Sequence, residues 1–135
     1  MSWFESRWSN KLKIYYTTQE EKQLLLVDLS ARYPYNVAIR CKDEESRFIC
    51  YLTSDMLREI QNNTFYWDYK PYLFPLSSMT KEQSKIYHEL IGGMFGTSAL
   101  INFEVLEDFF HKNHLDYRGL IPIGLAIDCT NLNIY

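Results

Sequence analysis

A stretch of alternating apolar and polar residues, set between two helix starts, most constrains the fold of this chain. In residues 36–53, Val37 and Ile39 share one side of a predicted strand, and Cys50 and Leu52 share one side of a second. A polar run between the two predicts a turn, so this stretch is typical of a β-hairpin.

Capping boxes mark a helix on either side of this hairpin. Thr18 is followed three residues later by Glu21, and Thr80 is followed in the same way by Gln83. In such a box the two side chains accept hydrogen bonds from backbone N–H groups that the first helical turn leaves free. The boxes therefore predict two helices, over residues 18–33 and 80–91. Pro34 is predicted to end the first, because the residue before a proline disfavours helical angles.

Three other segments have local patterns of their own. Asn102 is a candidate cap for a helix over residues 102–113. The buried stripe of that helix is predicted to consist of Val105, Leu106, Phe109 and Phe110. Ser54 is a candidate cap for a short helix over residues 54–60. Residues 64–69 are rich in β formers and predict a third strand.

The segment that follows the predicted third strand contains two prolines. Pro71 and Pro75 lie in residues 70–79, and a proline cannot donate a hydrogen bond to a neighbouring strand. We therefore expect this segment to be extended but to lie outside the middle of a sheet. Residues 120–127 are apolar and fit either a short helix or a final strand.

The order of these elements predicts an α+β fold. We expect a small antiparallel sheet, made of the hairpin and a short third strand, with about three helices packed on it. Residues 1–17 are predicted to be an N-terminal extension, and residues 18–135 a single domain, because 135 residues suit one core.

Composition narrows the classes of function. The formal net charge is −3, which does not favour nucleic acid as a partner. The three cysteines include no CxxC pair, so they indicate free thiols rather than a disulfide framework or a zinc site. No signal peptide or transmembrane segment is apparent, and we expect a cytoplasmic protein.

Aromatic residues make up 16% of the chain, and some gather near its start. Trp3, Phe4 and Trp8 are spaced so that a helix would place Phe4 and Trp8 on one face. These three residues are a candidate interface for a partner or a membrane surface. The alternative is that they dock onto the chain's own domain, since an exposed aromatic stripe costs solubility.

Motifs for catalysis are not apparent, and no cofactor is predicted. Glu107, His111 and His114 are spaced i, i+4 and i+7 on a predicted helix, as in a helical metal site. The alternative is a solvated polar face, with histidines near the negative end of the helix dipole. The chain has neither a GxSxG elbow nor a phosphate-binding loop.

Two polar stretches, residues 70–80 and 114–121, are the strongest candidates for a binding site. If they meet in the fold, their side chains would form one surface. The alternative is that the two stretches interlock as scaffold, with the proline stretch against the loop. The candidate binding residues are Tyr72, Ser77, Ser78, Asp116, Tyr117 and Arg118.

These two stretches, together with the segment from Leu24 to Tyr35, resemble a family of small uncharacterised proteins of Bacteroidales prophages and mobile elements. Members of that family begin close to the first helix, so residues 1–17 look like an extension. The resemblance also makes a strand and loop over residues 54–60 as plausible as a helix. It implies a bacterial cytoplasm and an accessory protein that binds a host or element protein.

Three functions are compatible with the sequence. The leading hypothesis is a non-enzymatic protein-interaction or regulatory module with an unidentified protein partner; a homo-oligomer is also compatible. The first alternative is a small metal-dependent enzyme that uses Glu107, His111 and His114. The second is an accessory protein for single-stranded nucleic acid, because aromatic side chains can stack on bases without much basic charge.

Overall fold

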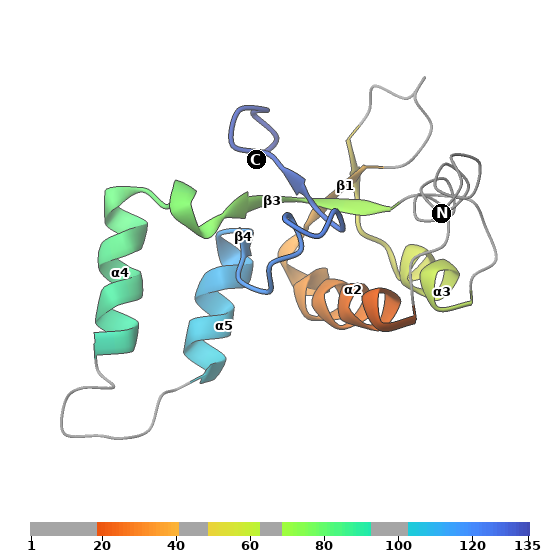
Figure 1. Cartoon of the computed structure of the whole chain (residues 1–135), viewed down its shortest axis with the longest axis horizontal. Coiled ribbons are helices and arrows are strands. Elements are labelled where there is room, and N and C mark those ends of the chain that lie inside the picture. The colour runs from red at the N-terminus through yellow and green to blue at the C-terminus, as the bar shows by residue number, and fades with distance from the viewer. Residues whose placement is uncertain (1–18, 41–48, 63–68, 93–102) are drawn as a thin grey trace, which may run out of the picture. The chain divides into compact units, whose positions relative to one another are not determined.

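The computed structural model describes residues 19–40, 49–62, 69–92 and 103–135 (Figure 1). Its contacts divide the chain into two compact units, one of Met1–Tyr72 with Ile134–Tyr135 and one of Leu73–Asn133. The described residues contain four α-helices and five strands, so the predicted α+β class is confirmed. The helix count exceeds the expected three because residues 54–62 are helical.

The first helix among the described residues ends one residue before its predicted end. The helix α2 (Gln19–Arg32) is followed by the 3-10 turn η1 (Tyr33–Tyr35), which contains Pro34. The turn is followed by Asn36 with a φ of 55°, a left-handed conformation that asparagine tolerates better than most residues. The predicted cap Thr18 lies outside the described residues.

The predicted hairpin is present in the first unit. The strands β1 (Ala38–Arg40) and β2 (Cys50–Tyr51) pair antiparallel, with Ile39 opposite Cys50. The predicted turn lies outside the described residues, as does Cys41. Ile39 is buried and Cys50 is half-buried, which agrees with the apolar side predicted for both.

The short helix after the hairpin has a different cap from the one predicted. The helix α3 spans Ser54–Asn62, and its Met56 N–H donates to Oγ1 of Thr53 at 3.2 Å. Ser54 is therefore the first helical residue and not the cap. Both residues carry a hydroxyl, so the sequence pattern alone does not separate the two positions.

The expectation that the proline segment lies outside the middle of the sheet is wrong. The strand β3 (Lys70–Pro75) is an inner strand in the order β2-β1-β3-β4, in which β4 is Leu115–Asp116. Each neighbouring strand pairs with only part of β3. In the first unit, β1 pairs with the first residues of β3, with Ile39 opposite Pro71. In the second unit, β4 pairs with the last residues of β3. Pro71 and Pro75 lack a backbone N–H, but each lies at the end of a short ladder. The sheet therefore accommodates both prolines in an inner strand. Of the segment predicted as the third strand, residues 64–68 lie outside the described residues.

In the described part of the second unit, two helices lie between the strands β3 and β4 in the sequence. After the 3-10 turn η2 (Leu76–Ser78), the helices α4 (Lys81–Gly92) and α5 (Phe103–Lys112) lie side by side (Figure 1). The strands β4 (Leu115–Asp116) and β5 (Ile127–Asp128) follow, and both pair with β3.

The sheet is mixed, not antiparallel as expected. β3 and β4 run parallel, with Phe74 opposite Leu115, and the N–H of Phe74 donates to the carbonyl of His114 at 2.8 Å. A parallel pair needs a long crossover between its strands. The chain provides one, because α4 and α5 lie between β3 and β4 in sequence. The apolar segment at residues 120–127 forms turns and the start of β5.

None of the helices in the described ranges is long and apolar enough to cross a membrane. Each unit has buried apolar side chains of its own. Leu25, Leu29 and Ile39 are among those of the first unit, and Leu73 and Leu115 among those of the second.

The capping box of α4 is present in full. The N–H of Gln83 donates to Oγ1 of Thr80 at 3.1 Å, and the N–H of Thr80 donates to Oε1 of Gln83 at 3.0 Å. We expect Thr80→Ala to lower the free energy of unfolding by about 1 kcal/mol, measured by urea denaturation, because it removes the cap acceptor. Thr80→Ser keeps the hydroxyl and serves as control; equal losses in both variants would contradict this role.

Candidate functional site

The two polar stretches singled out in the sequence meet in the second unit. Pro75, near the end of the first stretch, lies opposite Asp116 of the second, across the parallel pair of β3 and β4. The contact is made by backbone pairing, which is the interlocking scaffold that the sequence left as an alternative. The role of each side chain then depends on what it touches.

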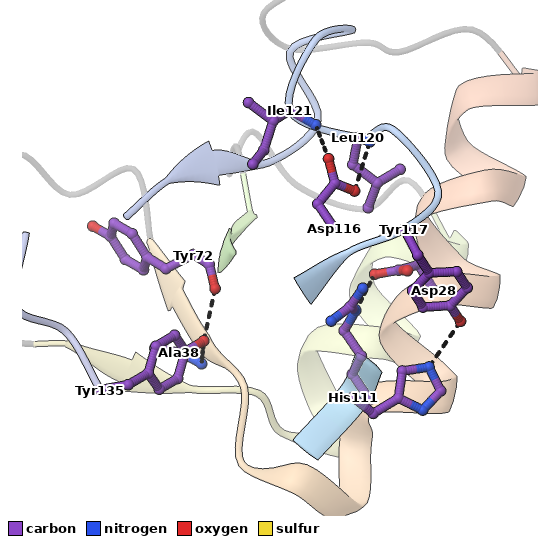
Figure 2. A network of polar contacts seen from close by, with 10 residues as sticks. Asp28, Ala38, Tyr72, His111, Asp116, Tyr117, Leu120, Ile121 and Tyr135 are labelled. Carbon is purple, nitrogen blue, oxygen red and sulfur yellow. Dashed lines mark hydrogen bonds and ion pairs between the residues drawn. The ribbon is translucent and has the colours of Figure 1, made fainter. Parts of the chain in front are cut away.

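The carboxylate of Asp116 holds the loop that follows it. Its Oδ1 accepts a hydrogen bond from the N–H of Leu120 at 2.8 Å, and its Oδ2 accepts one from the N–H of Ile121 at 2.9 Å (Figure 2). The side chain is buried, and Gly119 supplies a φ of 76° within the loop. Both carboxylate oxygens of Asp116 are thus used in shaping the chain.

The hydroxyl of Tyr117 is hydrogen-bonded to Nε2 of His111 at 2.8 Å (Figure 2). The Tyr117 ring stacks on Phe110, with 4.7 Å between centroids and 13° between planes. The guanidinium of Arg118 lies 5.0 Å from the centroid of the same ring, within cation–π range. Tyr117 therefore joins α5 to the loop, and Arg118 covers its ring.

The remaining candidates of the first stretch are not gathered into one site. Ser78 donates from Oγ to the carbonyl of Pro75 at 2.7 Å, which closes the turn η2, and Ser77 is exposed. Tyr72 belongs to the first unit, where its carbonyl accepts a hydrogen bond from the hydroxyl of Tyr135 (Figure 2). The same Tyr135 hydroxyl accepts a hydrogen bond from the N–H of Ala38 at 2.9 Å.

The metal candidates are not brought together. Glu107 is exposed, while His111 is only 4% exposed and bonds to Tyr117. His114 lies beyond the end of α5 with a φ of 54°, so it leaves the helical face on which the spacing placed it. In the described ranges no group of three His, Cys, Asp or Glu side chains is arranged to hold a metal ion. The predicted solvated face is also wrong for His111, because Tyr117 covers it.

The thiol of Cys129 is poorly suited to nucleophilic chemistry. Burial raises the pKa of Cys129 to about 11, and the nearby negative charge of Asp128 adds to the effect. The thiolate is the reactive form of cysteine, so this side chain stays protonated and inert at neutral pH.

A groove between α4 and α5 is the site that the structure adds. It has a volume of about 480 Å³. Its apolar lining consists of two pairs spaced i, i+4, one on each helix: Ile86 with Leu90, and Val105 with Phe109. Ile86 is 40% exposed and Val105 is 44% exposed, so the groove presents apolar surface to solvent.

Polar side chains border this groove. At one end, Nε2 of Gln83 donates to Oδ1 of Asn113 at 3.1 Å, which ties the start of α4 to the end of α5. Glu82 and Asp108 contribute negative charge from the two helices, and Lys112 contributes a positive charge. The groove thus has an apolar floor and a polar, net acidic border.

Sequence reasoning missed this groove. It placed Val105 in the buried stripe of the predicted helix and assigned no role to Ile86. The i, i+4 spacing of Ile86 and Leu90 indicates an apolar row on the predicted helix, but it does not indicate that this row stays exposed. The predicted interface residues Trp3, Phe4 and Trp8 lie outside the described residues.

Comparisons with protein families, curated proteins and solved structures gave no match to this chain. The resemblance to the prophage and mobile-element family therefore stays a prediction. The groove and the side chains around it are therefore the features of the described residues that point to a function.

Removing the hydroxyl of Tyr117 tests its structural role. We expect Tyr117→Phe to lower the free energy of unfolding by about 1 kcal/mol, because the hydrogen bond to His111 is lost while the stacking on Phe110 is kept. Urea denaturation measures the loss. Tyr51→Phe, at a side chain 52% exposed, is the control and should leave stability unchanged. A Tyr117→Phe variant as stable as this control would contradict the role.

Proposed function

We propose that this protein is a non-enzymatic protein-interaction or regulatory module that uses the groove between α4 and α5. The observation that carries the proposal is the apolar surface at Ile86 and Val105, exposed on two neighbouring helices and bordered by polar side chains. An apolar centre with a polar rim is the usual anatomy of a protein–protein interface.

The environment of the polar motif residues supports a binding role over a catalytic one. Asp116 uses both carboxylate oxygens to hold backbone N–H groups, and His111 is buried against Tyr117. A catalytic acid or base needs a group within reach of a substrate. The acidic groups at the groove also favour a protein over nucleic acid, whose phosphates Glu82 and Asp108 would repel.

The resemblance found in the sequence fits this proposal. An accessory protein of a prophage or mobile element would act in a bacterial cytoplasm and would meet host proteins there. Under this proposal the partner is a protein, and no metal or organic cofactor is required.

Site-specific photo-crosslinking tests the proposal. A photo-reactive residue at position 86, in the groove, should give a discrete protein adduct in a nuclease-treated lysate of the source cells. The control position is 123, because Ile123 is 50% exposed and lies in the same unit. Absence of an adduct at position 86, or the same adducts at both positions, would overturn the proposal. An adduct that requires intact nucleic acid would favour the nucleic-acid alternative.

A further inference from the structure

The walls of the groove restrict how a partner can bind. Both walls are α-helices, whose interior backbone N–H and C=O groups are already paired within the helix. A partner therefore cannot add a β-strand here, because that mode needs an open row of backbone donors and acceptors. Recognition must come from side chains packing against side chains.

The exposure of the lining argues against a small molecule. Enclosed ligand sites bury about 70–90% of the ligand surface. Ile86 and Val105 are 40% and 44% exposed, while Leu90 is half-buried and Phe109 is buried, so the groove is open at one apolar residue of each wall. An open apolar groove of this kind suits a continuous ridge of partner side chains better than a compact ligand.

The length of the groove suits a partner helix. α5 has 10 residues, which at the helical rise gives a wall about 15 Å long. Roughly ten residues of helix fit this length, enough for apolar anchors at i, i+3 or i+4, and i+7. Each wall already carries an i, i+4 apolar row, and a ridge of a third helix packs between such rows.

The charge around the groove indicates the polar character of that helix. Glu82 on α4 and Asp108 on α5 line the groove, opposed within the lining by Lys112 alone. Beyond the lining, the exposed residues of α5 add Glu104 and Glu107. Those of α4 add Lys81 and Lys85 against Glu89, so the acidic excess lies on the α5 side of the groove. Basic side chains flanking the apolar face of a partner helix would be complementary to this border.

We propose that the groove between α4 and α5 binds an amphipathic partner helix that carries apolar anchors on one face and Lys or Arg beside them. This inference rests on the proposed function and specifies the chemistry of the partner. A second copy of the chain is a less complementary occupant, since it would bring its own acidic α5 to an acidic border.

Selection from a display library of helical peptides tests the inference. In the library the apolar positions are fixed, and the flanking positions vary among Lys, Arg, Glu, Gln and Ser. The full chain is the target. We expect selected peptides to be enriched in Lys or Arg at the flanks, and their affinity to fall with rising salt.

Substitutions in the groove locate the binding. We expect Ile86→Gln combined with Val105→Gln to weaken a selected peptide at least about ten-fold. Glu82→Gln combined with Asp108→Asn should weaken it about three- to ten-fold and flatten the salt dependence. The control is Ile123→Gln combined with Leu132→Gln, because both residues are 50% exposed in the same unit. Thermal unfolding of each variant verifies that it is folded.

The outcomes separate this inference from the proposed function. Groove-dependent peptides with acidic or indifferent flanks would overturn the basic partner and leave the interaction module standing. An absence of selected peptides, or peptides that bind the groove variant unchanged, would overturn both. A dimer that dissociates in the Ile86→Gln and Val105→Gln variant would make a second copy the occupant and overturn the inference.

Discussion

Replacing Arg32 with Met is expected to lower the free energy of unfolding by about 3–5 kcal/mol. Nε of Arg32 donates to Oδ2 of Asp28 at 2.7 Å, and both side chains are 0% exposed. One turn of α2 separates the two residues, which places them on the same helical face. Met preserves much of the side-chain volume but removes the cation that compensates a fully buried carboxylate.

An exposed ion pair on α3 provides the matched control. Arg58 pairs with Asp55, and their side chains are 67% and 75% exposed. Arg58→Met should therefore cost less than about 1 kcal/mol in the same urea denaturation. If Arg32→Met and Arg58→Met have equal effects, the buried pair does not have the role assigned to it. Combining Asp28→Leu with Arg32→Met should recover part of the stability, because it removes both buried charges.

The helices and the hairpin were predictable because their signals are local. The reciprocal bonds of Thr80 and Gln83 depend on residues three apart, and the stop at Pro34 depends on a single ring. The pair of Asp28 and Arg32 also has a local signature, the i, i+4 spacing of opposite charges. The complete burial of this pair has no local signature, because burial depends on the rest of the fold.

The sheet was harder to predict because its pairing is non-local. The prolines of β3 argue against an inner strand only if both neighbours run along its whole length. Here β1 and β4 pair with opposite ends of it. The parallel direction of β4 depends on a crossover through α4 and α5, and no short segment of sequence encodes that.

The candidate site was predicted in part. The polar stretches do meet, but the roles of Asp116 and Tyr117 depend on groups that only the fold brings close to them. His111 was assigned to a polar helical face, yet Tyr117 covers it. The groove depends on which apolar row of α4 stays exposed. The exposure of a row depends on how much of each helix the neighbouring helix covers. The helical spacing of apolar residues alone does not determine it.

Replacing Asp116 with Ala is expected to lower the free energy of unfolding by about 2–4 kcal/mol. The change removes both acceptors of the loop, and the N–H groups of Leu120 and Ile121 then lose their carboxylate partner. Leu120 is fully buried, so water cannot readily replace the lost bond. Asp116→Asn keeps one acceptor and should lie between Ala and the wild type. Urea denaturation measures all three proteins.

Asp128 is an exposed carboxylate that also accepts hydrogen bonds from the chain, so it is the matched control for Asp116. Asp128 accepts hydrogen bonds from the hydroxyl and the N–H of Thr130, and they lower the pKa of Asp128 below its ordinary value of 3.8. Their contribution is therefore present at neutral pH and is lost as the pH falls through that lowered pKa. Asp128→Ala should nevertheless have a much smaller effect than Asp116→Ala, because water can reach the groups that it releases. Equal losses in the two variants would show that burial is not what makes Asp116 important.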